Sequence, residues 1–100
     1  MKVLLKNEKR RVERNVKRAR DAGCRADLSD VQWGYLVGHY NARCAYCGGA
    51  METMDHIVPL ANGGGTTFAN VTPCCLSCNE AKGTAVWLPA QAGAEAMVKW

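Results

Sequence analysis

Two Cys-x-x-Cys pairs, Cys44/Cys47 and Cys75/Cys78, constrain this chain of 100 residues more than any other feature. A chain of this length buries only about 60–65% of its unfolded surface, so its core is marginal without a further cross-link. Each pair can place two thiolates on one side of a metal, and four thiolates in a tetrahedron form a closed structural zinc site. The two-residue spacing favours Cys75 over its neighbour Cys74 as a ligand. The segment 48–74 is longer than the usual spacing of short zinc modules, so we expect a real substructure within it.

The cysteines leave other interpretations open. Iron in a four-thiolate site is one, and a redox dithiol is another, although nothing around either pair resembles a thioredoxin βαβ unit. In a secreted chain, six cysteines would indicate disulfides. The start Met-Lys-Val-Leu-Leu-Lys does not resemble a signal peptide, and no run approaches the ~20 apolar residues of a membrane span. We therefore expect a cytoplasmic protein, with Cys24 and Cys74 as thiols outside the metal site.

Positive charge is concentrated in the first 20 residues. They hold nine basic side chains against Glu8 and Glu13, whereas the remaining residues are mildly acidic. Two interpretations compete: a solvated helix face, or an arm that follows the phosphates of a nucleic acid. The density of cations favours the second. The expected contacts in this segment are Lys9, Arg10, Arg11, Arg14, Lys17 and Arg18.

Apolar spacing predicts three helices. The first covers residues 2–22 and carries a thin apolar stripe, Leu5, Val12, Val16 and Ala19. The second begins near Ser29, which forms a capping box with Gln32. Its apolar face consists of Trp33, Leu36, Val37 and Tyr40. The third covers residues 76–82 and ends at Gly83.

Residues 50–54 and 56–60 are predicted as the two strands of a hairpin. From these elements we predict a basic helical arm over residues 1–22 and an α+β domain over residues 23–88. Residues 89–100 are predicted as a C-terminal tail, for which a helix is one of the possible conformations.

The most informative residues lie between and just after the cysteine pairs. Asp55 and Asn79 offer hard oxygen ligands that suit Mg²⁺ or Mn²⁺. His56 follows Asp55 in a predicted strand and points locally to the opposite side, so it can face a substrate without ligating the same ion. An imidazole pKa near 6.5 suits a general base at neutral pH. Taken singly these residues are weak signals; together they supply the parts for metal-assisted hydrolysis of a phosphodiester.

The order Cys-x-x-Cys, Asp-His-Ile-x-Pro, Gly-Gly, Asn, Cys-x-x-Cys-Asn and Lys-Gly, over residues 28–83, resembles the zinc-containing branch of the HNH nuclease family. The resemblance implies a ββα-metal (His-Me finger) core with a four-cysteine structural zinc site on Cys44, Cys47, Cys75 and Cys78, preceded here by N-terminal helices. It implies that Asp55 and Asn79 hold the catalytic divalent metal and that His56 activates water. It also implies that Asn70 fixes the loop facing His56 and helps to orient its imidazole.

The chain departs from the family pattern at one position. Asn79 stands where the third letter of HNH is usually histidine, so this is an HNN variant. Losing an imidazole ligand favours magnesium or manganese over zinc, nickel or copper at the catalytic site. Arg43 and Lys82 lie near the expected phosphate path and are further candidate DNA contacts, although a helix-terminal lysine can simply complement the helix dipole.

The resemblance implies an endonuclease that hydrolyses DNA to 5′-phosphate and 3′-hydroxyl ends. One such site cuts one strand per event, so nicking is the elementary step. The alternative is a non-catalytic zinc-ribbon module that binds nucleic acid, which leaves Asp55, His56, Asn70 and Asn79 unexplained; a protein-interaction or redox module is a third. The expected partner of such a nuclease is DNA, and no membrane is expected to take part. A stand-alone HNH protein this small resembles those encoded by bacteriophages, so the expected location is the cytoplasm of a bacterial host. A homodimer and a packaging partner stay open.

Overall fold

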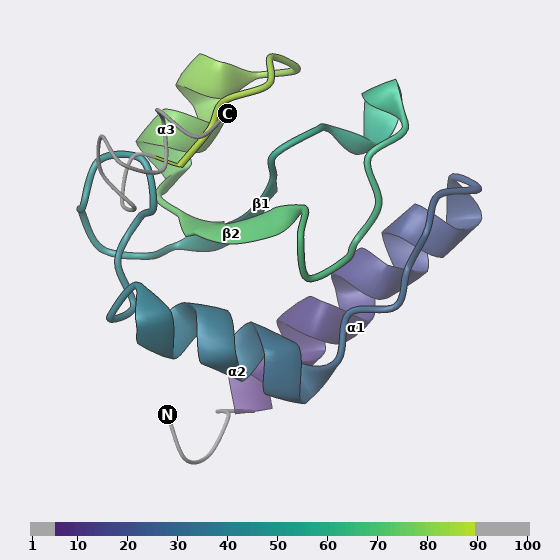
Figure 1. Ribbon diagram of the computed structural model, residues 1–100, viewed down its shortest axis with the longest axis horizontal. Helices are drawn as coiled ribbons and strands as arrows, with labels where there is room; N and C mark the ends of the chain where they lie inside the picture. Colours follow the sequence, from purple (N-terminus) through teal and green to yellow (C-terminus); the bar gives the residue numbers. More distant parts are fainter. Residues whose placement is uncertain (1–5, 90–100) are drawn as a thin grey trace.

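The computed structural model describes residues 6–89. Two short strands, β1 (Thr53–His56) and β2 (Val71–Cys74), pair in an antiparallel sheet. The sheet lies between α3 (Leu76–Lys82) on one side and α1 (Lys6–Asp21) and α2 (Asp30–His39) on the other (Figure 1). A 3-10 turn, Leu60–Asn62, lies in the loop between the strands. The order β1, β2, α3 is a ββα unit within an α+β fold, as the sequence predicts.

The described helices follow the predicted ones closely because their ends are encoded locally. Ser29 Oγ accepts from the backbone N–H of Gln32 at 3.1 Å, and Gln32 Oε1 accepts from the N–H of Ser29 at 3.0 Å, so the predicted capping box is present. Gly83 ends α3 with a φ of 54°, a conformation that glycine adopts without a Cβ penalty. The predicted tail from residue 90 onward lies outside the described residues, as do Leu5 and the rest of residues 1–5.

The predicted hairpin is wrong in its second strand. β1 pairs with β2, with Thr53 opposite Cys74 and His56 opposite Val71. His56 instead ends β1, and residues 57–60 begin the loop that joins the strands, because Pro59 has no N–H to donate to a ladder. The fully buried segment Val71–Cys74 supplies the partner strand.

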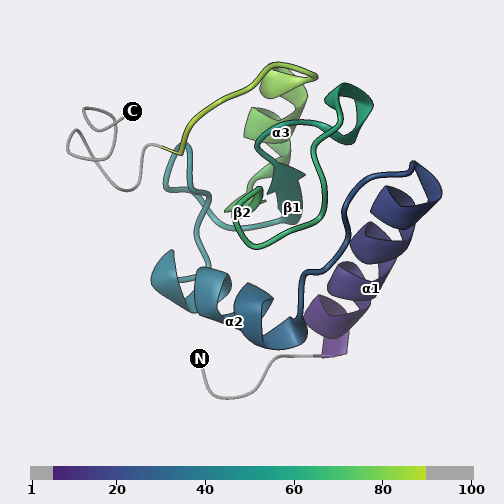
Figure 2. The ribbon, with the colours of Figure 1, turned by 45° about the vertical axis from the view of Figure 1, so that its right-hand side comes forward.

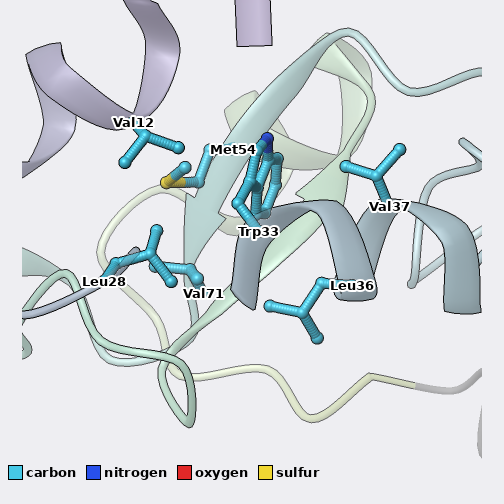
Figure 3. Packing of buried hydrophobic residues seen from close by; sticks show 7 residues of the cluster. All are labelled: Val12, Leu28, Trp33, Leu36, Val37, Met54 and Val71. Atoms are coloured by element: carbon cyan, nitrogen blue, oxygen red, sulfur yellow. The ribbon is translucent and has the colours of Figure 1, made fainter. Parts of the chain in front are cut away.

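One hydrophobic core joins the sheet to α1 and α2. It consists of the buried side chains Val12, Leu28, Trp33, Leu36, Val37, Met54 and Val71 (Figure 3). Figure 2 shows the first turns of α1 beside the start of α2, where the indole Nε1–H of Trp33 donates to Glu8 Oε1 at 2.9 Å. The boundary predicted at residue 22 therefore marks the end of a helix, but α1 packs on the core of the domain that follows. Over residues 6–89, none of the helices has the length and hydrophobicity needed to cross a membrane.

Candidate functional site

Four cysteine sulfurs from two distant segments meet at one point. The Sγ atoms of Cys44, Cys47, Cys75 and Cys78 all lie within 4.8 Å of one another, and those of Cys47 and Cys75 are 3.6 Å apart. Tetrahedral zinc with bonds of about 2.3 Å would place its sulfurs about 3.8 Å apart. Cys74, in contrast, is buried and turns its thiol to the carbonyl of Cys75. The donor set and its spacing therefore fit a structural zinc ion, and the choice of Cys75 over Cys74 agrees with the geometry.

Backbone N–H groups support the thiolates. Burial by itself would raise the pKa of Cys44, but hydrogen bonds from backbone N–H groups, including that of Tyr46, lower it to about 6. Cys75 is also the N-cap residue of α3, and its Sγ accepts from the N–H of Cys78 at 3.3 Å. The cluster consequently ties the start of α3 to the loop before β1.

A second cluster of polar groups lines a cleft of about 500 Å³. β1 contributes Asp55 and His56, and α3 contributes Asn79. Asp55 and His56 are adjacent in β1 and both line this cleft. Their side chains bond to different partners, Asp55 to Tyr46 and His56 to Thr66. Carboxylate and amide oxygens on one wall of a cleft are a donor set that fits Mg²⁺ or Mn²⁺.

Asp55 is buried and held by two donors. The hydroxyl of Tyr46 donates to Asp55 Oδ2 at 2.6 Å, and Lys82 Nζ lies 3.4 Å from the same oxygen. Lys82 also donates to the backbone carbonyl of His56 at 2.8 Å. The lysine side chain is only 1% exposed and bonds inward to the site, so its role as a DNA contact stays a prediction.

The imidazole of His56 is also buried. Its Nε2 lies 2.8 Å from Oγ1 of Thr66. Burial, and secondly the positive charge of Arg18, lowers the pKa of His56 to about 4. The ring is therefore neutral at neutral pH, which is the form that can accept a proton.

Asn70 closes the loop between β1 and β2. Its side chain accepts from the N–H of Val58 and donates to the carbonyls of Val58 and Gly65, at 2.9–3.0 Å. Gly64 permits this packing, because a Cβ there would lie 1.8 Å from the Val58 carbonyl oxygen. The side-chain hydrogen bonds of Asn70 hold the loop, whereas the imidazole is hydrogen-bonded to Thr66.

The basic residues predicted to bind DNA differ in whether they line the cleft. Arg11, Arg14 and Arg18 lie on one face of α1 and line the same cleft as Asp55 and His56. Lys9, Arg10 and Lys17 are exposed on α1 outside that lining, and Lys17 pairs with Asp21 at 2.9 Å. Arg43 lies near the cysteine cluster and donates to the carbonyl of Gly48 at 3.2 Å. The cationic wall of the cleft thus comes from α1.

Sequence reasoning missed the roles of Tyr46 and Thr66. Tyr46 stands between Cys44 and Cys47. This position could have indicated a role, because a residue between two metal ligands must lie close to the metal cluster. Thr66 follows the glycines at 63–65, which are typical of a loop, and no local pattern distinguishes it from Thr67.

The comparisons with known proteins agree with this geometry. Residues 44–85 match the family model described as HNH endonuclease. The chain is also 29% identical, over 83 aligned positions, to the SPbeta prophage-derived putative HNH endonuclease YoqL of Bacillus subtilis (strain 168). That alignment covers 69% of this chain and 35% of YoqL, so the chain spans about a third of this relative's length. The matched segment includes both cysteine pairs, β1, β2 and α3. Residues 44–85 of this chain are therefore similar to the HNH endonuclease family.

Proposed function

We propose that this chain is a metal-dependent endonuclease that hydrolyses DNA phosphodiester bonds one strand at a time. The observation that carries the proposal is the convergence of Asp55, His56 and Asn79 in one cleft that three arginines of α1 also line. A zinc-binding module without catalytic activity has no need of this arrangement.

Asp55 and Asn79 would hold the catalytic Mg²⁺ or Mn²⁺. When bound, such a cation stabilises the negative charge that develops on the scissile phosphate and its leaving oxygen. Zinc in the cysteine cluster would serve the fold, because all four of its positions are taken by thiolates. The two sites then separate the structural from the catalytic requirement for metal.

His56 would act as the general base. Its neutral ring takes a proton from a water molecule, and the water oxygen forms a bond to phosphorus while the bond from phosphorus to the 3′ oxygen breaks. The 3′ oxygen takes a proton from solvent, so the products are a 5′-phosphate and a 3′-hydroxyl. The charge of Arg18 and the burial of the ring favour the neutral form.

Arg11, Arg14 and Arg18 would bind phosphates of the same DNA. A spacing of three to four residues places them along one face of α1, so each can meet a different phosphate oxygen. Phosphate contacts give affinity and register without reading sequence. The prophage origin in the name of YoqL supports a phage-borne nuclease that acts in a bacterial host, with a packaging protein as a further candidate partner. Double-strand cleavage would need a dimer or two successive nicks.

A plasmid-nicking assay tests the proposal. The zinc-loaded protein is incubated with supercoiled DNA, with and without added Mg²⁺ or Mn²⁺, rather than with a chelator that would also strip the cysteine cluster. We expect nicked circles only with added metal, and their loss in a folded His56→Ala variant. His39→Ala is the matched control, since His39 is the other histidine and is exposed on α2 outside the cleft. DNA binding without cutting under both metals would favour the zinc-ribbon alternative.

A further inference from the structure

The buried edge of His56 reaches helix α1 through one side chain. His56 Nε2 lies 2.8 Å from Thr66 Oγ1, and Thr66 Oγ1 lies 2.9 Å from the backbone carbonyl oxygen of Asn15. Thr66 is fully buried, at 0% exposure. The end of β1, the loop that follows it and the distant helix α1 therefore form one short chain of hydrogen bonds behind the imidazole.

Counting protons assigns a direction to this chain. A carbonyl oxygen can only accept, so the single hydroxyl proton of Thr66 points to Asn15. Thr66 Oγ1 can then only accept from the imidazole, so the proton of the neutral ring lies on Nε2. The lone pair is left on Nδ1. The opposite tautomer would leave Nε2 and the carbonyl of Asn15 competing for one hydroxyl proton, so one of these two buried acceptors would lose its hydrogen bond to Thr66.

We propose that Thr66 is a positioning residue that holds His56 in the Nε2–H tautomer, with Nδ1 as the basic atom toward the cleft. The inference rests on the proposed function of His56 as the base. His56 lines the cleft. Within residues 6–89, Thr72 Oγ1 is the buried side-chain atom that lacks a hydrogen-bond partner. Nδ1 of His56 is therefore not a buried, unpaired atom. Asn15 is the last member of this chain of hydrogen bonds, because its backbone carbonyl determines which way the Thr66 hydroxyl points.

The arrangement gives α1 a second role in the site. The side chains of Arg14 and Arg18 face the cleft, while the backbone of Asn15 between them orients the base through Thr66. Asn15 itself is buried and anchored, since its Nδ2 donates to the Arg11 carbonyl and its Oδ1 accepts from Arg18. A displacement of α1 would therefore affect both DNA binding and the orientation of the ring.

Nitrogen-15 NMR of the histidine rings tests the tautomer directly, without added catalytic metal and without DNA. The chain has two histidines, so His39 serves as the internal reference. We expect the neutral His56 ring to show the shifts of the Nε2–H tautomer, with an Nε2–H proton protected from exchange with water. In Thr66→Val the ring loses its acceptor and the protected signal disappears, whereas Thr66→Ser retains it. A wild-type spectrum of the Nδ1–H tautomer, or an unchanged signal in Thr66→Val, would overturn the proposal.

Nicking kinetics distinguish this inference from the proposed function. We expect Thr66→Val to lower kcat on the order of 10- to 100-fold, with little change in KM, and Thr66→Ser to recover most of it. Thr67→Val is the matched control, since Thr67 is the neighbouring threonine outside the chain of hydrogen bonds. Full activity in Thr66→Val together with loss in His56→Ala would remove the positioning role and leave the proposed base intact. No metal-dependent cutting by the wild type would remove both.

Discussion

The hydroxyl of Tyr46 donates a hydrogen bond of 2.6 Å to Oδ2 of Asp55, and so connects the loop of the cysteine cluster to the carboxylate of the cleft. Burial, and then the hydrogen bond to Asp55, raises the pKa of Tyr46 far above its usual value, so the phenol remains a donor. Tyr46 also packs edge-on against Trp87, with ring centroids 5.5 Å apart. With Oδ2 occupied by Tyr46 and Lys82, the other oxygen of Asp55 is left for a cation.

Replacing Tyr46 by phenylalanine tests this connection. Tyr46→Phe keeps the ring and its packing on Trp87 but removes the donor, so the Asp55 carboxylate is held less firmly. We expect Mn²⁺ affinity in the cleft to fall about 10-fold, with zinc content unchanged. The measurement is Mn²⁺ binding by electron paramagnetic resonance on the zinc-loaded protein, beside Tyr35→Phe, whose ring is exposed on α2. Equal Mn²⁺ affinities in the two variants would contradict the role of Tyr46.

Loss of one cysteine ligand should remove both zinc and fold. The core is small, and zinc binding is expected to supply much of the folding free energy, so Cys47→Ser should no longer bind one zinc per chain and should lose its cooperative thermal transition. Zinc content by atomic absorption and melting by circular dichroism are the readouts. Cys24→Ser is the control, since Cys24 lies outside the cluster. A folded, zinc-free Cys47→Ser protein would show that the metal is dispensable.

The buried lysine should affect stability rather than DNA binding. Lys82→Met removes the donor to the His56 carbonyl and leaves the buried Asp55 carboxylate without its positive partner. We expect a loss of about 3 kcal/mol in the free energy of unfolding, measured by urea denaturation. The salt dependence of DNA binding should not change, because the side chain does not reach solvent. A lower salt slope with full stability would restore the interpretation of Lys82 as a phosphate contact.

The arginines of α1 that line the cleft should account for part of the electrostatic contribution to DNA binding. Arg14→Ala combined with Arg18→Ala removes two cations from the cleft, so the slope of log K against log salt should fall by about 2. Lys17→Ala is the control, because Lys17 is exposed, pairs with Asp21 and lies outside the cleft lining. DNA affinity measured by fluorescence anisotropy at several salt concentrations decides the matter, and equal slopes for the two variants would contradict it. Point substitutions are required, since deleting residues 1–20 would also remove Val12 from the core.

The sequence by itself determined the features that depend on near neighbours. Ser29 and Gln32 cap α2 because they are three residues apart, and Cys75 pairs with Cys78 because two residues bring their thiols to one side of a turn. The family motif likewise identified Asp55 and His56, since it consists of short, ordered segments. Helix ends, ligand spacing and motif order are encoded within a few residues and survive any later packing.

Only the tertiary structure decided which distant segments meet. It paired β1 with Val71–Cys74 in place of the neighbouring residues 56–60, and it folded α1 onto the core so that Asn15 reaches Thr66. It also turned Lys82 inward to His56. These contacts depend on how buried surfaces pack together and on which partner each buried polar group bonds to. The spacing of residues along the chain determines neither of these two properties.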